Sequence, residues 1–214
     1  MKKCVEVVYN KLFEKYPVLV ECKNDIMAAF DVLDNCFSQG GKVLVCGNGG
    51  SACDSEHIIG ELMKGFLLKR ELREDTLDKF KMALPDNWEY ITASLQGALP
   101  AISLVSQTGI STAVSNDIAG DMIFAQQVFG YARKGDVLIG ISTSGNAKDV
   151  VNAVNVAKVM EMKTIGLTGV GGGVMGKICD VTIKVPDKET YIIQEYHLPV
   201  YHTLCAMLEM QYFG

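Results

Sequence analysis

Five short apolar segments recur along the chain, and a stretch long enough for a helix separates most of them. They occupy residues 42–48, 99–106, 136–143, 163–169 and 180–186. Continuous apolar runs of this length are typical of parallel strands buried on both faces. Helical patterns fall at residues 53–68, around 118–132, at 147–162 and from 192 towards 212. We therefore predict an α/β fold, a three-layer αβα sandwich with a five-stranded parallel sheet.

The first forty residues show the apolar periodicity of two added helices. Apolar side chains recur every three or four positions from Val5 to Phe13 and again from Ile26 to Phe37, and Gly40 and Gly41 follow. Such helices can pair with another subunit or cover the sheet of their own subunit, and the pattern favours neither. We treat residues 1–214 as a single domain, with residues 1–40 predicted to be a helical oligomerisation arm.

Residues 69–99 interrupt the alternation of strands and helices. The segment is rich in charge and contains the only tryptophan, Trp88. It is too long for a plain connection, so we expect it to contain a helix or a lid.

Composition restricts the classes of partner. The 214-residue chain has a net charge of −5 at pH 7, so we expect neither nucleic acid nor an anionic membrane as a partner. No apolar run reaches the ~18 residues of a membrane span, and charges interrupt residues 1–17, unlike a signal peptide. The seven cysteines are scattered without a CxxC pair, which predicts reduced thiols and a cytoplasmic location.

A glycine-rich loop, "GNGGSA" at residues 47–52, follows the first apolar run. It satisfies the G-x-G-x-x-G/A pattern, but a dinucleotide site also needs an acidic residue ~20 positions later, at the end of the next strand. Here the next predicted strand begins only at residue 99 and ends without a carboxylate. The remaining prediction is an anion site made by backbone amides and the start of a helix.

The third apolar run ends in "STSGNA", residues 142–147. Ser, Thr and Asn are favoured at ordinary helix starts, and one hydroxyl is enough for a cap. Three consecutive hydroxyls next to free amides can also bind several phosphate oxygens. Because "GNGGS" is predicted to follow a neighbouring strand, we favour phosphate binding.

His57 and Glu61 are four residues apart in a predicted helix and therefore share a face. That spacing suits two ligands of one metal ion, although a single His–Glu pair is more often a surface or core pair.

A second group of chemically active side chains lies in "QEYHLPVYH": Gln194, Glu195, His197 and His202. All three histidines of the chain therefore lie in two segments. Gln194 and His202 are separated by ~12 Å along an ideal helix, so spacing alone does not pair them on one ion. Pro199 between them predicts that the helix starts, kinks or breaks there.

Five motifs together resemble the phosphoheptose isomerases, a branch of the sugar isomerase (SIS) domain family. The motifs are "GNGGSACDSEHIIGEL", "SNDIAGDMIF", "GDVLIGISTSGN", "LTGVGGGVMGKICDVTIKVP" and "IIQEYHLPVYH". Their order and spacing cover the chain from about residue 43 to residue 210, and the resemblance fails only at residues 66–99.

The resemblance implies a SIS-type, flavodoxin-like sandwich and a homotetramer with active sites where subunits meet. It also implies isomerisation of a sugar phosphate through an enediolate, with sedoheptulose 7-phosphate and glycero-manno-heptose 7-phosphate as the expected pair. Family members with a metal hold zinc (Zn2+) through residues that match His57, Glu61, Gln194 and His202.

The same resemblance assigns expected roles to other residues. Those matching Glu61 and His202 are base and acid, although whether Glu61 is ligand, base or both in turn stays open. The expected substrate-binding set is Asn48, Gly49, Gly50, Ser51, Asn116, Asp117, Ser142, Thr143, Ser144 and Gln194. Isomerisation requires a base over the carbon acid, a group that stabilises the oxygens and a phosphate anchor, which these segments can supply.

Two departures from the family concern the substrate more than the reaction. This chain has Ala147 where relatives commonly have a serine, and Gly65 where they commonly have an arginine that reaches the substrate. Lys64 is the neighbouring candidate to replace that arginine.

A non-catalytic protein is the second hypothesis, since some SIS-domain proteins sense phosphosugars or regulate replication initiation. In the replication-initiation relatives the positions matching Glu61 and His202 are not Glu and His. Their presence here favours an enzyme. A third hypothesis keeps the isomerase chemistry and changes the sugar.

Overall fold

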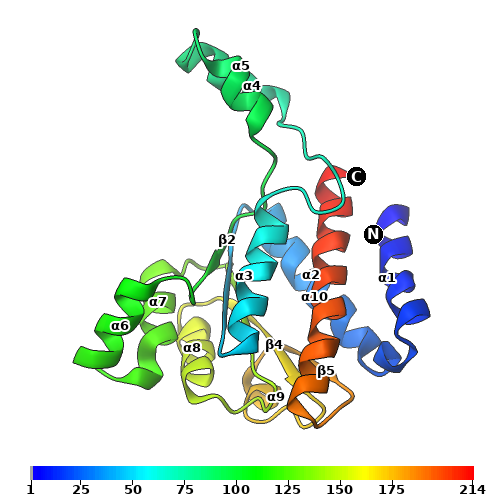
Figure 1. The fold of residues 1–214 in the computed structure, drawn as a ribbon, viewed down its shortest axis with the longest axis vertical. Coiled ribbons are helices and arrows are strands. Elements are labelled where there is room, and N and C mark those ends of the chain that lie inside the picture. Colours follow the sequence, from blue (N-terminus) through cyan, green and yellow to red (C-terminus); the bar gives the residue numbers. More distant parts are fainter. Residues whose placement is uncertain (1) are drawn as a thin grey trace.

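A five-stranded, all-parallel sheet forms the centre of the molecule (Figure 1). The structure is a computed structural model that describes residues 2–214. The strands are β1 (Val43–Gly47), β2 (Ala101–Ser103), β3 (Val137–Ile141), β4 (Lys163–Gly169) and β5 (Val181–Val185), in the order β2-β1-β3-β4-β5. The predicted α/β class and all five predicted strands are confirmed, although β2 is shorter than its apolar run.

Helices cover both faces of this sheet because successive strand residues point to opposite sides. Val43 and Val45 pack with one helix layer, whereas Leu44 and Cys46 pack with the other. The first layer contains α1 (Lys3–Lys15), α2 (Lys23–Ser38), α3 (Gly50–Met63) and α10 (Thr190–Phe213). The second contains α7 (Ile123–Tyr131), α8 (Lys148–Val159) and α9 (Met175–Ile178), and α6 (Thr108–Asp117) packs on α7.

The N-terminal helices pack within their own subunit. Helix α1 lies along α10, and η1 (Pro17–Cys22) joins it to α2, which contacts β5 and α10. This arrangement agrees with the hypothesis that residues 1–40 cover their own sheet. The same segment exposes apolar side chains, including Val7 at 60% and Val20 at 54%, so its role in oligomerisation stays a prediction.

Helix α10 is a single helix of 24 residues that continues through Pro199. The prediction of a start or break at this proline was therefore wrong. Pro199 is buried and has no N–H to donate to the Glu195 carbonyl, one turn earlier. Glu195 is exposed, so water can reach this residue. No helix within residues 2–214 is long and apolar enough to cross a membrane.

The region after β2 differs from the predicted pattern. Instead of one helix over residues 118–132, the chain forms α6, a short η2 turn (Gly120–Met122) and α7. Helix α6, "TGISTAVSND", was not predicted, because its Ser, Thr and Gly residues have low helix propensity and only Val114 of it is buried.

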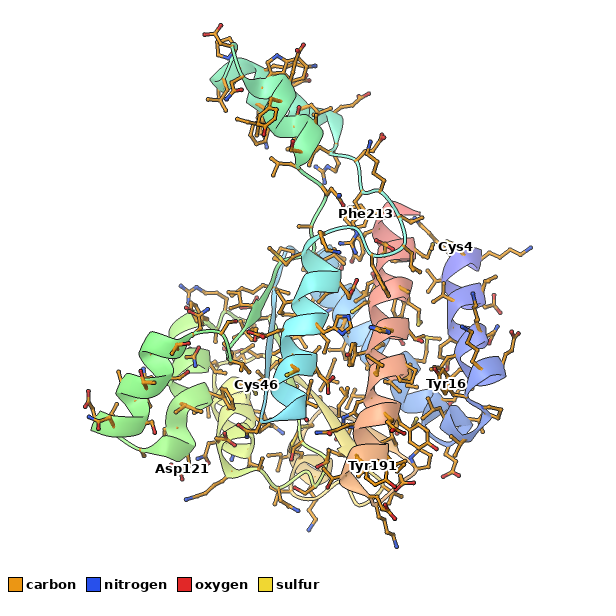
Figure 2. All side chains as sticks on the ribbon, in the orientation of Figure 1. Cys4, Tyr16, Cys46, Asp121, Tyr191 and Phe213 are labelled. Carbon is orange, nitrogen blue, oxygen red and sulfur yellow. The ribbon has the colours of Figure 1, made fainter. Side chains whose placement is uncertain are left out.

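The middle of residues 69–99 forms an arm that projects from the body, whereas Arg70 and Leu99, near the two ends of this segment, are buried in the body (Figure 1). The arm contains α4 (Glu74–Ala83) and α5 (Trp88–Ser94), and no residue of either helix is buried. The predicted helix is therefore present, but the arm extends away from the sheet, with side chains exposed around it (Figure 2).

Candidate active site

Two loops follow adjacent strands at the carboxyl edge of the sheet. Gly47 ends β1 and pairs with Ile141, which ends β3. After β1 the chain turns at Gly49, whose φ of 56° favours glycine, and α3 starts at once. The α3 N-terminus therefore lies beside the "STSGN" loop, as the sequence predicts, and this edge of a parallel sheet is where ligands usually bind.

The polar side chains of these loops already have partners within the chain. Ser142 Oγ lies 3.5 Å from Ser144 Oγ, and the amides of Ala147 and Asn146 lie 3.4 and 3.2 Å from Ser142 Oγ and Ser144 Oγ respectively. The hydroxyls thus accept hydrogen bonds from amides of the turn before α8, although no side chain caps α8 itself. Capping and phosphate binding use the same oxygens and amides, so both remain compatible with this geometry.

Other residues of the predicted substrate set lie at the same edge of the sheet or in α6. Ser51 is buried at the start of α3, and Asn48 Nδ2 donates to both carboxylate oxygens of Asp149, at 3.0 and 2.9 Å. Asn116 and Asp117 are exposed at the end of α6, where their side chains bond to each other at 2.7 Å. Both residues remain predicted contacts to the sugar.

Three side chains converge between α3 and α10. His57 Nε2 lies 3.1 Å from Glu61 Oε1 and 3.4 Å from His202 Nε2. All three offer a ligand atom within 4.8 Å of one another, and such a group can hold a metal ion. Two zinc ligands at 2.0–2.1 Å in a tetrahedral site are roughly 3.3 Å apart, so these spacings fit zinc.

The pairing within this group is incomplete. Glu61 Oε2 is buried and has no hydrogen-bond partner among the described residues, whereas 44% of the His57 side chain is exposed. A buried carboxylate oxygen without a donor in the chain is usually accounted for by a water molecule, an ion or a ligand. Burial and the neighbouring His57 lower the pKa of His202, against the opposing effect of Glu61, which favours the neutral ring that binds metals.

Gln194 and His197 lie elsewhere on α10. The Gln194 amide contacts Gly50, because a Cβ atom there would lie 2.7 Å from Gln194 Nε2. Since Gly50 and His57 are about 10 Å apart along α3, Gln194 is remote from the other proposed ligands in this chain, and its metal role stays a prediction. His197 is fully buried, and desolvation lowers its pKa to about 4.

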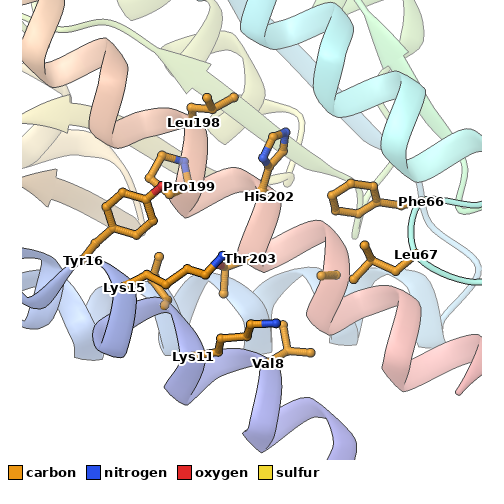
Figure 3. Close-up of a pocket in the computed structure, with 12 residues that line it drawn as sticks. Val8, Lys11, Lys15, Tyr16, Phe66, Leu67, Leu198, Pro199, His202 and Thr203 are labelled. Atoms are coloured by element: carbon orange, nitrogen blue, oxygen red, sulfur yellow. The ribbon is translucent and has the colours of Figure 1, made fainter.

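A cavity of about 230 Å³ opens beside His202, between α1 and α10 (Figure 3). Lys11 and Lys15 of α1 line it together with Phe66 and Leu67. Lys11 and Lys15 lie more than 180 positions before His202, and their spacing of four is common on exposed helix faces. Sequence reasoning therefore missed the positive charge that they bring to this site.

An ion pair holds the chain between α3 and the arm. Arg70 and Glu209 have side chains that are 0% exposed, and Arg70 Nε donates to Glu209 Oε1 at 2.8 Å. The carboxylate also accepts the backbone amides of Phe66, Leu67 and Leu68 at 2.7–3.1 Å. The other Arg70 nitrogens donate to the carbonyls of Glu61 and Leu62, at 2.7 and 2.6 Å, and so cap the end of α3.

Gly65 lies in the segment that this ion pair fixes. A Cβ atom at Gly65 would lie 2.3 Å from the Leu68 carbonyl oxygen and 2.6 Å from Gln96 Oε1, so this conformation excludes any side chain. Lys64 is exposed, and its Nζ bonds the Gly65 carbonyl at 3.1 Å. The loop in this conformation therefore has no room for an arginine at position 65.

Comparison with known proteins gives one consistent result. The SIS domain family matches residues 14–86 and 88–169. A phosphoheptose isomerase of Rhodospirillum rubrum is 38% identical over 191 residues, which cover 89% of this chain and 88% of the relative. The solved structure of a phosphoheptose isomerase from Francisella tularensis has a TM-score of 0.71 at 30% identity, covering 98% of this chain and 100% of that one. One from Neisseria gonorrhoeae has a TM-score of 0.67 at 30% identity, covering 92% and 96%. The chain therefore belongs to the SIS domain family and, within it, to the phosphoheptose isomerases.

Proposed function

We propose that this protein isomerises sedoheptulose 7-phosphate and glycero-manno-heptose 7-phosphate. The observation that supports this most is the convergence of His57, Glu61 and His202 within 4.8 Å, in a chain that belongs to the phosphoheptose isomerases. The reaction moves a proton between adjacent carbons, which requires a base at the carbon and an acid near the substrate oxygens.

Glu61 is the proposed base and His202 the proposed acid. Glu61 Oε2 has no partner among the described residues and is therefore available to take a proton from carbon, while Oε1 stays at His57. The Glu61 carboxylate thus has one atom for a ligand role and one for proton transfer. His202 lines the cavity beside Lys11 and Lys15, where it can exchange a proton with a substrate oxygen.

Zinc is the proposed metal, held by His57, Glu61 and His202, with Gln194 as the predicted further ligand. Two imidazoles and a carboxylate are donors that zinc prefers, and the free Glu61 oxygen is consistent with a missing ligand. When bound, zinc would polarise the substrate carbonyl and stabilise negative charge on its oxygen.

The phosphate is proposed to bind Ser51, Ser142, Thr143 and Ser144, near the α3 N-terminus. Asn48, Gly49, Gly50, Asn116 and Asp117 are the proposed contacts to the rest of the substrate. Lys11 and Lys15 add positive charge beside His202 and supply an electrostatic attraction for the dianionic substrate that the acidic chain as a whole lacks.

The active form is proposed to be a cytoplasmic homotetramer. Exposed apolar residues of α1 and η1 and the exposed side of His57 support burial of this face against other subunits. Light scattering at micromolar concentration should give a tetramer. A fully active monomer would contradict the proposal that subunits meet at the site.

The decisive test of function is turnover of purified protein with sedoheptulose 7-phosphate, with metal content measured on the same sample. We expect an aldose phosphate product and about one zinc ion per chain. Zinc-loaded protein that binds the sugar phosphate without turnover would support the non-catalytic, phosphosugar-sensing alternative. Turnover of a different sugar phosphate only would keep the chemistry and change the substrate.

A further inference from the structure

A buried tyrosine and a half-buried aspartate lie on the Nδ1 side of His57, whose Nε2 faces Glu61 and His202. Tyr201 Oη is 3.0 Å from His57 Nδ1 and 3.2 Å from Asp54 Oδ1. Tyr201 comes from α10 and is 2% exposed, whereas Asp54 precedes His57 by three residues on α3. The three groups therefore form a chain of contacts that ends at the histidine nitrogen opposite the proposed metal side.

The number of hydrogens on Asp54, Tyr201 and His57 limits which group can donate at each contact. The tyrosine hydroxyl has one hydrogen to donate, and an ionised carboxylate can only accept. The Tyr201 hydrogen bond to Asp54 leaves the tyrosine oxygen to accept the hydrogen of His57 Nδ1, provided that Nε2 carries no hydrogen, as when a metal ion is bound there. With the hydrogen on Nδ1, the neutral imidazole has its lone pair on Nε2, the nitrogen that faces Glu61 and His202 at 3.1 and 3.4 Å.

We propose that Tyr201 and Asp54 are positioning residues that hold His57 in the tautomer and orientation needed to bind the metal ion. The inference rests on the metal centre of the proposed function and adds to it two residues outside the predicted ligand set. Residues that hydrogen-bond the far nitrogen of a metal-binding histidine commonly fix its ring and increase its basicity.

The negative charge of Asp54 is also coupled to metal binding at His57. Asp54 Oδ2 is buried and has no hydrogen-bond partner among the described residues, so the carboxylate is incompletely solvated. Burial raises its pKa, while the Tyr201 hydrogen bond and His57 act in the opposite direction. A cation bound at His57 Nε2 would offset this burial, so metal binding and the negative charge of Asp54 favour each other.

Zinc affinity tests the proposal directly. Tyr201→Phe keeps the buried ring and removes only the hydroxyl. We expect zinc affinity, measured by competition with a chelator on the full chain, to fall about 10- to 100-fold. Asp54→Asn keeps an acceptor and removes the charge, so its loss should be smaller.

Tyr212→Phe is the matched control, because Tyr212 lies on the same helix and its hydroxyl donates to Asp34 Oδ1 at 2.9 Å. It removes an equivalent tyrosine–aspartate bond far from His57 and should leave zinc affinity unchanged. Melting of the metal-free proteins shows whether any variant has lost its fold. Equal zinc affinities in Tyr201→Phe, Tyr212→Phe and the parent would overturn the proposal.

Proton–nitrogen NMR of the zinc-loaded protein gives a readout that does not depend on activity. The parent should show a slowly exchanging hydrogen on His57 Nδ1, and this signal should exchange faster in Tyr201→Phe. A hydrogen on Nε2 in the parent would refute the assigned direction. If the parent binds no zinc, the proposed metal centre itself is wrong. If the parent binds zinc and Tyr201→Phe binds it equally well, only the proposed role of Tyr201 is wrong.

Discussion

Two polar clusters lie between the same helices, α3 and α10, and differ in how fully their atoms are paired. Both carboxylate oxygens of Glu209 accept two hydrogen bonds each, from Arg70 and three backbone amides. In the other cluster Glu61 Oε1 lies 3.1 Å from His57 Nε2, and Oε2 has no partner among residues 2–214.

The difference separates a structural role from a chemical one. A carboxylate that the chain has saturated has no capacity left for a ligand, and it stabilises the loop and helix end that donate to it. A carboxylate that is buried and unsaturated keeps an oxygen available for a metal ion or a proton. The comparison predicts that changes in the first cluster affect stability and changes in the second affect metal binding and catalysis.

The largest effect is expected at the unsaturated cluster. Glu61→Gln keeps the size of the side chain and removes the proposed base, so the isomerisation rate should fall ~10²–10⁴-fold. His202→Asn should cause a loss of similar order. Because both residues are proposed ligands, turnover and zinc content must be measured on the same samples, with Glu195→Gln as an exposed control on α10.

A variant that is reloaded with zinc and stays slow while it binds sugar phosphate would assign the chemistry to the residue itself. If both variants exchange the substrate proton with solvent at the parent rate, Glu61 and His202 are not the acid–base pair.

The saturated cluster should show the larger loss of stability. Arg70→Met leaves Glu209 buried with its charge unpaired, and breaking a buried ion pair costs about 3–5 kcal/mol of the free energy of unfolding. Urea denaturation measures the loss, and Arg73→Met, at an exposed pair with Asp75, is the control that should change little. An Arg70→Met protein of parental stability that had lost zinc would contradict the division between the two clusters.

His197 provides a third case, a fully buried ring whose two nitrogens have no hydrogen-bond partner among residues 2–214. Its pKa of about 4 in the folded protein lies below the ordinary value of 6.5, so between these values the unfolded chain binds more protons. Stability should therefore fall as pH decreases from 6.5 towards 4, by about 3 kcal/mol from this residue. In metal-free protein, His197→Leu should flatten the pH dependence of the unfolding free energy. An identical slope in parent and variant would show that folding does not lower the pKa of His197.

The smallest effect is expected at the "STSGN" loop, where hydroxyls cap the turn and are proposed to bind phosphate. Ser144→Ala should weaken sugar-phosphate binding by about 1–3 kcal/mol, roughly five- to over a hundred-fold, without loss of zinc. Ser38→Ala, which removes an exposed hydroxyl at the end of α2, is the control. Unchanged affinity by calorimetry would mean that Ser144 is only a cap.

The local pattern of the sequence predicts much of the fold. Apolar runs locate all five strands, because a strand buried on both faces needs apolar residues at every position. The same pattern fails for α6, which buries little, and for Pro199, where packing along both neighbouring turns outweighs the missing hydrogen bond.

The site was predictable only where local spacing or a family resemblance marked it. The i,i+4 pair of His57 and Glu61 carries its own signal, and the resemblance added His202. Tyr201 and Asp54 are 147 positions apart, and Arg70 and Glu209 are 139 apart, so nothing local pairs them. Arg70 stands in a charged run that reads as solvent-exposed, and only the folded chain shows that it is buried.

Helix α10 packs against α1, α2 and α3, as well as β4 and β5. These partners are made first during synthesis, yet the apolar face that covers them is supplied by residues 190–213. A growing chain therefore exposes the inner sides of three helices until residues 190–213 leave the ribosome. The helix that brings His202 to His57 also closes the core, so these two histidines meet only after residues 190–213 have been translated.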